Sequence, residues 1–160
     1  RGALYAGLLV TPEGPKLIEY NIRFGDPDSQ VVLLRATSDL AALLAAAADG
    51  DLRAGPAPAF ADDAAVLVVA ASEGYPTSPR TGDVVEGLDD AATVEGVTVL
   101  GAGVRRDAEG RVVTAGGRVL NVVGRGPDPA TARARAYDAV GRIRWPGMHH
   151  RTDIAAGSGG

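Results

Sequence analysis

A short alternating segment of the chain holds the side chains best suited to chemistry. Glu19 and Asn21 stand two residues apart within it, and in a β-strand that spacing places both side chains on one face. A carboxylate and an amide oxygen are hard ligands of the kind that Mg²⁺ and Mn²⁺ take. Such a cation is normally shared with nucleotide phosphates, because it offsets their charge while a phosphoryl group moves. The pair is therefore a candidate metal site.

Arg23 continues the same face if the strand extends that far. Its guanidinium could hold a phosphate or a carboxylate through two parallel hydrogen bonds. Spacing alone leaves a second interpretation open, since Glu-x-Asn in a strand is more often the solvated face of a hairpin. The pair by itself does not decide between the two.

The strand that carries Glu19 needs a partner, and the preceding residues supply one. Residues 3–10 form a short apolar run that ends at a turn containing Pro12 and Gly14, and residues 16–22 alternate polar and apolar side chains. Two such runs around a Pro/Gly turn predict a β-hairpin. Alternation places the following residues on the Glu19 face: Leu17, Asn21 and Arg23.

Two short helices are expected after the hairpin. Asp26-Pro27-Asp28 is a typical helix start, and an Ala-rich helix is expected from Ser38-Asp39 to about Ala48, where Asp49-Gly50 ends it. Residues 54–63 are rich in Pro, Gly and Ala and form the candidate domain boundary. We therefore expect one domain over residues 1–55 and a second over residues 56–160.

The second part of the chain reads as strands closed by a helix. Strands are expected at residues 65–71, 97–104, 111–114 and 119–123, with a hairpin turn at 107–110. One amphipathic helix is expected from Asp128 to about Ile143, because Ala132, Ala136 and Val140 recur at helical spacing. The fold class predicted for the whole chain is α+β.

Composition limits the classes of function. The chain has 160 residues, enough for one ordinary domain or for a small domain joined to part of another. A net charge of −4 gives no reason to expect nucleic-acid binding, and the absence of cysteine excludes disulfides, thiolate metal sites and a cysteine nucleophile. No apolar run reaches the roughly 20 residues that span a bilayer. We expect a soluble, cytoplasmic protein with no membrane partner.

The string from Glu19 to Asp28 resembles a motif of the glycinamide ribonucleotide synthetases, which are ATP-grasp ligases. That motif reads E-[FY]-N-x-R-F-G-D-P-E, and here Asp28 replaces the final Glu. The resemblance continues over nearly the whole chain, at residues 4–8, 38–40, 74–76, 116–120 and 151–154. It implies the C-terminal part of an ATP-grasp domain, made of the hairpin and helices, followed by a small β-rich domain with one closing helix.

The resemblance also implies an activity and a site. Enzymes of this family join glycine to 5-phosphoribosylamine in purine biosynthesis, using ATP and forming a glycyl phosphate on the way. Glu19 and Asn21 match the family's Mg²⁺ or Mn²⁺ ligands, while Arg23, Gly25 and Asp26 are expected substrate contacts. No catalytic residue is assigned. Many other ATP-grasp proteins have an acidic third ligand near the place of Gly7.

One segment departs from the family pattern. Residues 100–104 read Leu-Gly-Ala-Gly-Val where the family usually has Phe-His-Ala-Gly-Thr. The loss of the His and the Thr argues against a polar role for this strand but not against the fold, and no role is assigned to it.

Two other functions are compatible with parts of the sequence. The chain could be a fragment without ligase activity of its own, since no Gly-rich nucleotide-covering loop or adenine-binding segment precedes Arg1. Its expected partner is then the missing N-terminal part of the same enzyme. A biotinyl or lipoyl carrier is the weaker alternative, because the single lysine, Lys16, lacks a Met-Lys-Met-like surrounding. The glycines at 101–103 and 116–117 are expected to be turn or bulge glycines, and the adjacent His149 and His150 are not expected to bind a metal.

Overall fold

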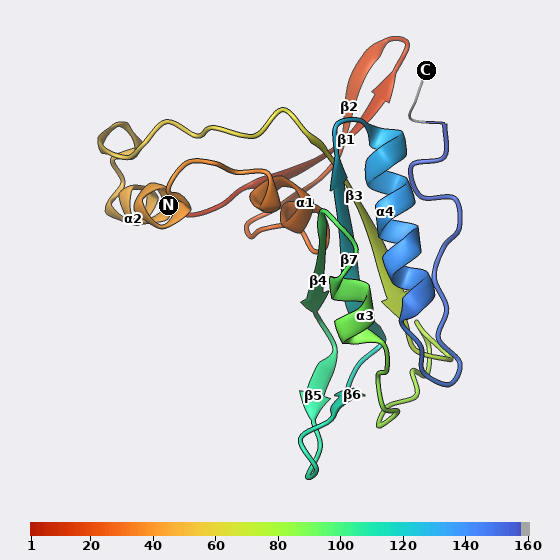
Figure 1. Cartoon of the computed structure of the whole chain (residues 1–160). Helices are drawn as coiled ribbons and strands as arrows, with labels where there is room; N and C mark the ends of the chain where they lie inside the picture. Colours follow the sequence, from red (N-terminus) through yellow and green to blue (C-terminus); the bar gives the residue numbers. More distant parts are fainter. Residues whose placement is uncertain (158–160) are drawn as a thin grey trace. The chain divides into compact units, whose positions relative to one another are not determined.

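The computed structural model describes residues 1–157 and shows two compact units, Arg1–Ala61 and a second that begins at Asp62. Each unit combines strands with helices (Figure 1), so the predicted α+β class is confirmed. The domain limits predicted from the sequence, 1–55 and 56–160, stay a prediction. No helix in the described part of the chain is long and apolar enough to cross a membrane.

The first unit is built on the predicted hairpin. Strand β1 (Tyr5–Thr11) pairs antiparallel with β2 (Gly14–Asn21). The pairing slips by one residue, since Gly7 is opposite Glu19 and Leu8 is opposite Leu17. Ile18 is therefore the extra residue of a β-bulge. Because Gly7 and Leu8 point to opposite faces of β1, Leu17 does not share the Glu19 face, and that part of the predicted alternation is wrong.

Three short helical segments follow the hairpin in the first unit. They are α1 (Asp28–Leu34), α2 (Leu40–Asp49) and a 3₁₀ turn, η1 (Leu52–Ala54). The ends of α2 are as predicted: the Asp39 side chain accepts a hydrogen bond from the backbone N–H of Ala42 at 3.0 Å, and Gly50 takes a left-handed conformation after the last turn. Pro27 lies just outside α1 and not at its first helical position.

The second unit contains a three-stranded antiparallel sheet with the order β3-β7-β4. Its members are β3 (Ala64–Ala71), β7 (Arg118–Gly126) and β4 (Val97–Gly101). A separate hairpin joins β5 (Val104–Arg106) to β6 (Val112–Thr114) through the predicted turn at 107–110. The single strand predicted at 97–104 is thus two strands, because the backbone of Gly103 turns to pair with Arg118 and Ala115.

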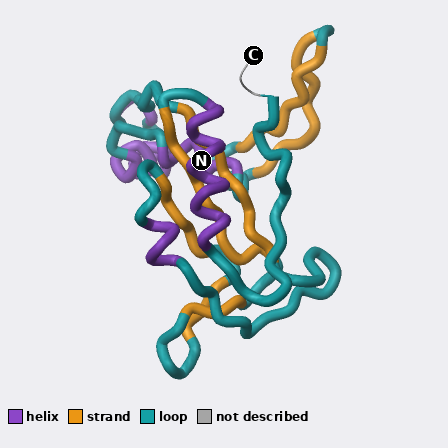
Figure 2. The backbone as a smooth tube through the Cα atoms, turned by 45° about the vertical axis from the view of Figure 1, so that its right-hand side comes forward, coloured by secondary structure: helices purple, strands orange, loops and turns teal. Residues whose placement is uncertain are grey.

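Helix α4 (Pro129–Arg142) covers the sheet of the second unit and closes its core (Figure 2). The Asp128 side chain caps it by accepting a hydrogen bond from the Thr131 N–H at 2.7 Å. The predicted face of this helix is confirmed, since Ala132, Ala136 and Val140 are buried. Gly124 of β7 lies so close to the helix that a Cβ atom there would collide with backbone atoms of Ala132 and Ala136.

Two further features of the second unit have no clear sequence signal. Helix α3 (Leu88–Ala92) is only 5 residues long and packs beside β4. After α4 the chain runs back along that helix (Figure 1), where Arg133 and Tyr137 hold it. Arg133 donates to the carbonyl oxygens of Ile154 and Thr152 at 2.9 and 2.8 Å, and the Tyr137 hydroxyl donates to that of Arg151 at 2.7 Å.

Candidate functional site

Strand β2 brings Glu19 and Asn21 into direct contact. The Asn21 side-chain Nδ2 donates a hydrogen bond to Glu19 Oε1 at 2.9 Å. Within residues 1–157, the Asn21 amide oxygen and the second Glu19 oxygen accept no other hydrogen bond. Glu19 is exposed and Asn21 is half-buried. The structure thus has a pair of accessible hard oxygens on one face of the hairpin, which fits a divalent cation.

The opposite strand adds an aromatic ring to this face but no third acid. Tyr5 lies across from Asn21, and Gly7 lies across from Glu19, so all four positions share one face. The described residues contain no group of three or more His, Cys, Asp or Glu side chains that could hold a metal ion. A cation here would have only two protein ligands and would need its remaining oxygens from a ligand or water. Tyr5 was not among the predicted site residues, although its place two residues before Gly7 was a usable signal.

Arg23 lies off the strand. Strand β2 ends at Asn21, and the chain bends over the next two residues. The Arg23 side chain is exposed, and its Nη1 donates to the Phe24 carbonyl oxygen at 3.0 Å. The prediction that Arg23 continues the Glu19 face is therefore wrong, because the regular alternation stops before it. Arg23 follows Asn21 by two residues and carries a positive charge.

Gly25 and Asp26 form the turn between the hairpin and α1. Gly25 is buried, and its carbonyl oxygen accepts hydrogen bonds from both the backbone N–H and the hydroxyl of Ser29. Asp26 is exposed, and one of its carboxylate oxygens accepts a hydrogen bond from Gln30 Nε2 at 3.2 Å. Both contacts tie the turn to the first turn of α1, so the backbone at 25–26 is held in one arrangement.

A largely apolar groove of about 640 Å³ opens beside this turn in the first unit. Tyr5, Arg23 and Gly25 line it, whereas Glu19 and Asn21 do not. Four of the predicted site residues therefore fall on two surfaces, the metal-ligand face and the groove, whereas Asp26 is not among the residues that line the groove. Tyr5 belongs to both surfaces. Large apolar side chains make up much of the remaining wall: Leu4, Phe24, Val32, Leu33, Leu40, Leu43, Leu44, Leu52 and Phe60.

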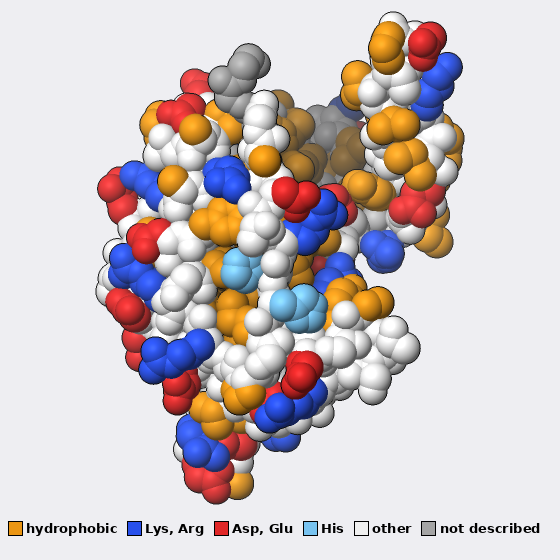
Figure 3. Space-filling model, turned by 90° about the vertical axis from the view of Figure 1, so that its right-hand side faces the viewer, with side chains coloured by type: hydrophobic (Ala, Val, Ile, Leu, Met, Phe, Trp, Pro, Cys, Tyr) orange, Lys and Arg blue, Asp and Glu red, His pale blue; other side chains and the backbone are white. Residues whose placement is uncertain are grey.

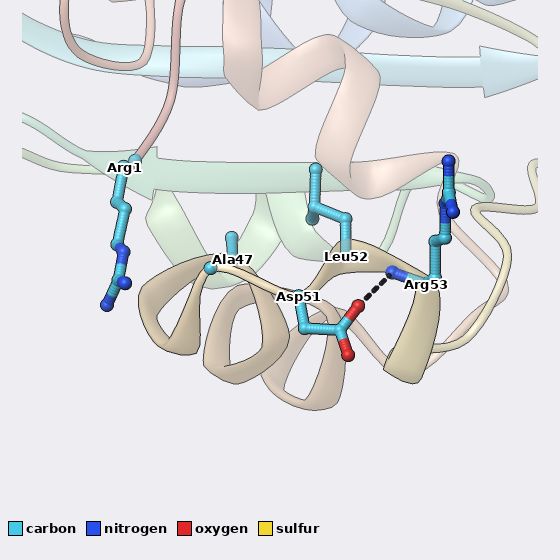
Figure 4. Close-up of a pocket in the computed structure, with 7 residues that line it drawn as sticks. Arg1, Ala47, Asp51, Leu52 and Arg53 are labelled. Carbon is cyan, nitrogen blue, oxygen red and sulfur yellow. Dashed lines mark hydrogen bonds between the residues drawn. The ribbon is translucent and has the colours of Figure 1, made fainter.

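The other candidate sites do not bring reactive side chains into contact. A hollow at the end of α2 is lined by Arg1, Asp51 and Arg53, but these charged groups point in different directions (Figure 4). Asp51 instead caps η1 by accepting from the Arg53 N–H at 3.2 Å. The backbone of His149 pairs with Ala71.

The remaining motifs have structural roles. The His150 ring packs on the Tyr137 ring with centroids 5.9 Å apart. Gly103 and Gly116 pack backbone against backbone, with no room for a Cβ atom at Gly103. Lys16 lies within β2 opposite Leu9 and not at the hairpin tip, where a carrier domain would need its lysine.

Comparisons with known proteins place the two units in one class, the ATP-grasp ligases. Residues 65–157 match the family described as phosphoribosylglycinamide synthetase, C domain, and residues 1–29 match phosphoribosylglycinamide synthetase, ATP-grasp (A) domain. Two relatives cover nearly the whole chain. The phosphoribosylamine–glycine ligase of Leifsonia xyli is 54% identical over 97% of it, and that of Streptomyces coelicolor is 52% identical over 99% of it. The chain belongs to the phosphoribosylglycinamide synthetase family.

A solved structure agrees with this family. The crystal structure of phosphoribosylamine–glycine ligase from Thermotoga maritima matches 95% of the chain with a TM-score of 0.76 and 32% sequence identity. The predicted family and its C-terminal fold are thereby confirmed. The chain spans only 37% and 38% of the Leifsonia and Streptomyces relatives and 36% of the Thermotoga chain.

Proposed function

We propose that this chain provides the metal-ligand face and part of the substrate site of a phosphoribosylamine–glycine ligase of de novo purine biosynthesis. In the complete enzyme the γ-phosphoryl group of ATP would pass to the glycine carboxylate, giving ADP and a glycyl phosphate. The amine of 5-phosphoribosylamine would then attack the acyl carbon, and phosphate would leave. The observation that carries this proposal is the contact between Glu19 and Asn21, two hard-oxygen side chains side by side on one face of the hairpin.

Glu19 and Asn21 would hold Mg²⁺ or Mn²⁺ through the carboxylate and the amide oxygen. A bound divalent cation would neutralise charge on nucleotide phosphate oxygens, which is the chemistry that such ions supply in phosphoryl transfer. The hydrogen bond from Asn21 Nδ2 to Glu19 Oε1 holds the two side chains next to each other. With only two protein ligands, most of the coordination shell stays available to phosphate oxygens and water.

The turn after the strand would bind substrate. Arg23 offers an exposed guanidinium for a phosphate or carboxylate group. Gly25 has no side chain and its carbonyl is already occupied by Ser29, so its part is to keep the turn compact beside the groove. Asp26 offers a carboxylate that could accept hydrogen bonds from an amine or hydroxyl. No residue of the chain is assigned a proton-transfer role.

The chain alone is expected to be inactive, and the rest of the ligase is its expected partner. Phosphoryl transfer depends mainly on positioning of the nucleotide and the acceptor. The hairpin face supplies two ligands and one flanking turn, which leaves the adenine, the triphosphate and 5-phosphoribosylamine to be held elsewhere. A glycine-dependent release of ADP by the purified chain would contradict this part of the proposal.

Complementation tests the whole proposal. The chain is mixed with the residues of a relative that precede the matched region, and glycine-dependent ADP formation is measured with Mg²⁺ and 5-phosphoribosylamine present. Activity is expected only in the mixture. E19Q or N21A is expected to lower it more than tenfold, because loss of even a residue that supports a metal ligand costs about 10- to 100-fold. E13Q is the matched control, because Glu13 lies at the hairpin tip and, within residues 1–157, its side chain bonds only Thr11. Equal activity of E19Q and E13Q would remove Glu19 from the site.

A further inference from the structure

Two glycines enclose the ring of Tyr5 in the first unit. A Cβ atom built on Gly25 would lie 3.1 and 3.2 Å from Tyr5 Cδ2 and Cε2, and one built on Gly7 would lie 3.7 Å from Tyr5 Cε1. The two positions face opposite edges of the ring. Gly7 and Gly25 therefore form a slot that Tyr5 fills, and the tighter wall of the slot is Gly25.

Each wall of the slot belongs to a part of the candidate site. Gly7 lies across from Glu19, and a Cβ atom on Gly7 would also come 3.3 Å from Glu19 Cγ. Gly25 belongs to the turn with Arg23 and Asp26. The ring thus lies between the metal-ligand face and the turn. A substitution at Gly7 or Gly25 would shift the ring, and the shifted ring would disturb both the face and the turn.

A carboxylate shares this wall of the slot with the ring. The Cβ position on Gly25 would also be 3.1 Å from Asp28 Oδ2. The side of Gly25 that would carry a Cβ atom is therefore covered by both the Tyr5 ring and the start of α1. The Tyr5 hydroxyl makes no hydrogen bond within residues 1–157, so the ring surface and not the hydroxyl makes this contact.

We propose that Tyr5 is a positioning residue that fixes the 23–28 turn against the Glu19–Asn21 face, with Gly7 and Gly25 as the slot that admits its ring. The function of the two surfaces that it joins rests on the proposed metal and substrate roles. The packing itself does not depend on them. Because site geometry must hold within fractions of an ångström to be productive, loosening this ring disturbs the Glu19–Asn21 face and its position relative to the 23–28 turn without removing any ligand.

The test uses Mn²⁺ as the probe and four variants of this chain. Y5L and G25A loosen or crowd the slot, Y5F keeps the ring, and Y20L removes a ring from the same hairpin at a residue that is paired with Ala6 and is 62% exposed. Mn²⁺ affinity is measured by electron paramagnetic resonance of the free ion. Two-dimensional NMR follows the Gly25 Hα and the Asn21 side-chain amide, and far-UV circular dichroism checks folding.

Y5L and G25A are expected to weaken Mn²⁺ binding about tenfold, the lower end of what loss of a supporting contact costs a metal site. Y5F and Y20L are expected to stay within about twofold of the wild type. The ring-current shift of Gly25 Hα should vanish in Y5L and persist in Y5F. Wild-type affinity in a folded Y5L variant overturns the proposal, and so does a Y5F variant as weak as Y5L, because that result assigns the role to the hydroxyl.

The same spectra separate failure of this inference from failure of the proposed function. A wild-type chain that does not bind Mn²⁺ contradicts the metal site, but the positioning role is then decided by the Asn21 side-chain amide. Its shift should change in Y5L and G25A and stay in Y5F and Y20L. An unchanged Asn21 signal in folded Y5L and G25A overturns the inference even if Mn²⁺ binds.

Discussion

Trp145 and Ile22 are both large apolar residues, yet Trp145 is 6% exposed in the second unit and Ile22 is 91% exposed in the first. The same contrast holds for their neighbours. Among the described residues, every buried hydrophobic residue except Ala46 lies in the second unit, and every exposed large hydrophobic residue except Tyr75 lies in the first. In Figure 3, hydrophobic side chains are visible over much of the hairpin surface.

The contrast separates two ways of holding a fold together. In the second unit, β3, β7 and α4 bury a shared apolar core, which is the dominant source of stability in small domains. The first unit relies on local hydrogen bonds, in the hairpin and at the capped ends of α2. Contiguous exposed apolar surface of this kind usually marks a place where another surface binds. The candidate site thus lies in the unit with the weaker core of its own.

Removing Trp145 should have the largest effect on stability. W145A is expected to lower the free energy of unfolding of the second unit by about 3–5 kcal/mol, because a buried aromatic side chain leaves a cavity. I22A should change the free energy of unfolding of the first unit by less than about 0.5 kcal/mol. Urea unfolding followed by far-UV circular dichroism measures both. Similar costs for the two variants would mean that Ile22 is buried in solution, and the contrast between the units would fail.

Crowding the contact between β7 and α4 should come next. G124A is expected to cost about 2–3 kcal/mol, since its Cβ atom meets the backbone of α4 and the helix must move. G141A in the same helix is the control, because within residues 1–157 no atom outside its own helical turn lies within 4 Å of its Cβ position. That variant should gain about 0.5 kcal/mol from helix propensity. Thermal unfolding of the two variants checks this prediction, because G124A should lower the stability and G141A should raise it.

The apolar surface of the hairpin should promote self-association. Replacing Leu8, Ile18 and Ile22 with Ser removes three side chains that are 56%, 67% and 91% exposed. The association constant is expected to fall by at least about tenfold, because burial of even part of this area favours contact. K16S, a polar change on the same strand, should leave association unaltered. Sedimentation velocity over a concentration series decides, and a wild-type chain that stays monomeric throughout would contradict the prediction.

The smallest expected effect is a loosening of the segment after α4 in acid. A hydrogen bond from the Arg151 side chain lowers the pKa of Asp153 from 3.8 to about 2. A lowered pKa in the folded state means that the ion pair stabilises the segment above about pH 4 and is lost as the pH falls toward 2. Amide exchange at residues 151–154 should rise over that window. In D153N this rise in amide exchange should disappear. If the rise persists in D153N, a different titrating group causes it.

The sequence contained enough information to predict local features whose signals lie within a few residues. Glu19 and Asn21 share a face because strand periodicity is two, and α4 begins at its predicted start because Asp128 is a strong cap. Other features depend on distant residues. The alternation of polar and apolar residues is unbroken at Ile18, so it gives no signal of the bulge. The end of β2 before Arg23 is likewise not marked by a Pro or Gly residue.

Strand partners were harder to predict than the strands themselves. Residues 112–114 and 118–126 flank a Gly-Gly pair and could have formed one hairpin, but β6 pairs with β5 while β7 enters the sheet between β3 and β4. That choice follows from packing of Gly103 against Gly116 and of Gly124 against α4, both of which join residues far apart in the sequence. Helix α3 was missed because a helix of 5 residues that follows a left-handed Gly87 has no side-chain cap.

The central place of β7 has a consequence for how the chain is made. Strands β3 and β4 do not pair with each other, and both must wait for residues 118–126 before they gain a neighbour. During synthesis the apolar β3 is therefore finished long before its partner leaves the ribosome, whereas the hairpin of the first unit can close as soon as Asn21 emerges. Late, non-local pairing is slow and leaves strand edges open to other chains. The unit with the better core when folded is thus the one most exposed to misassembly while it is being translated.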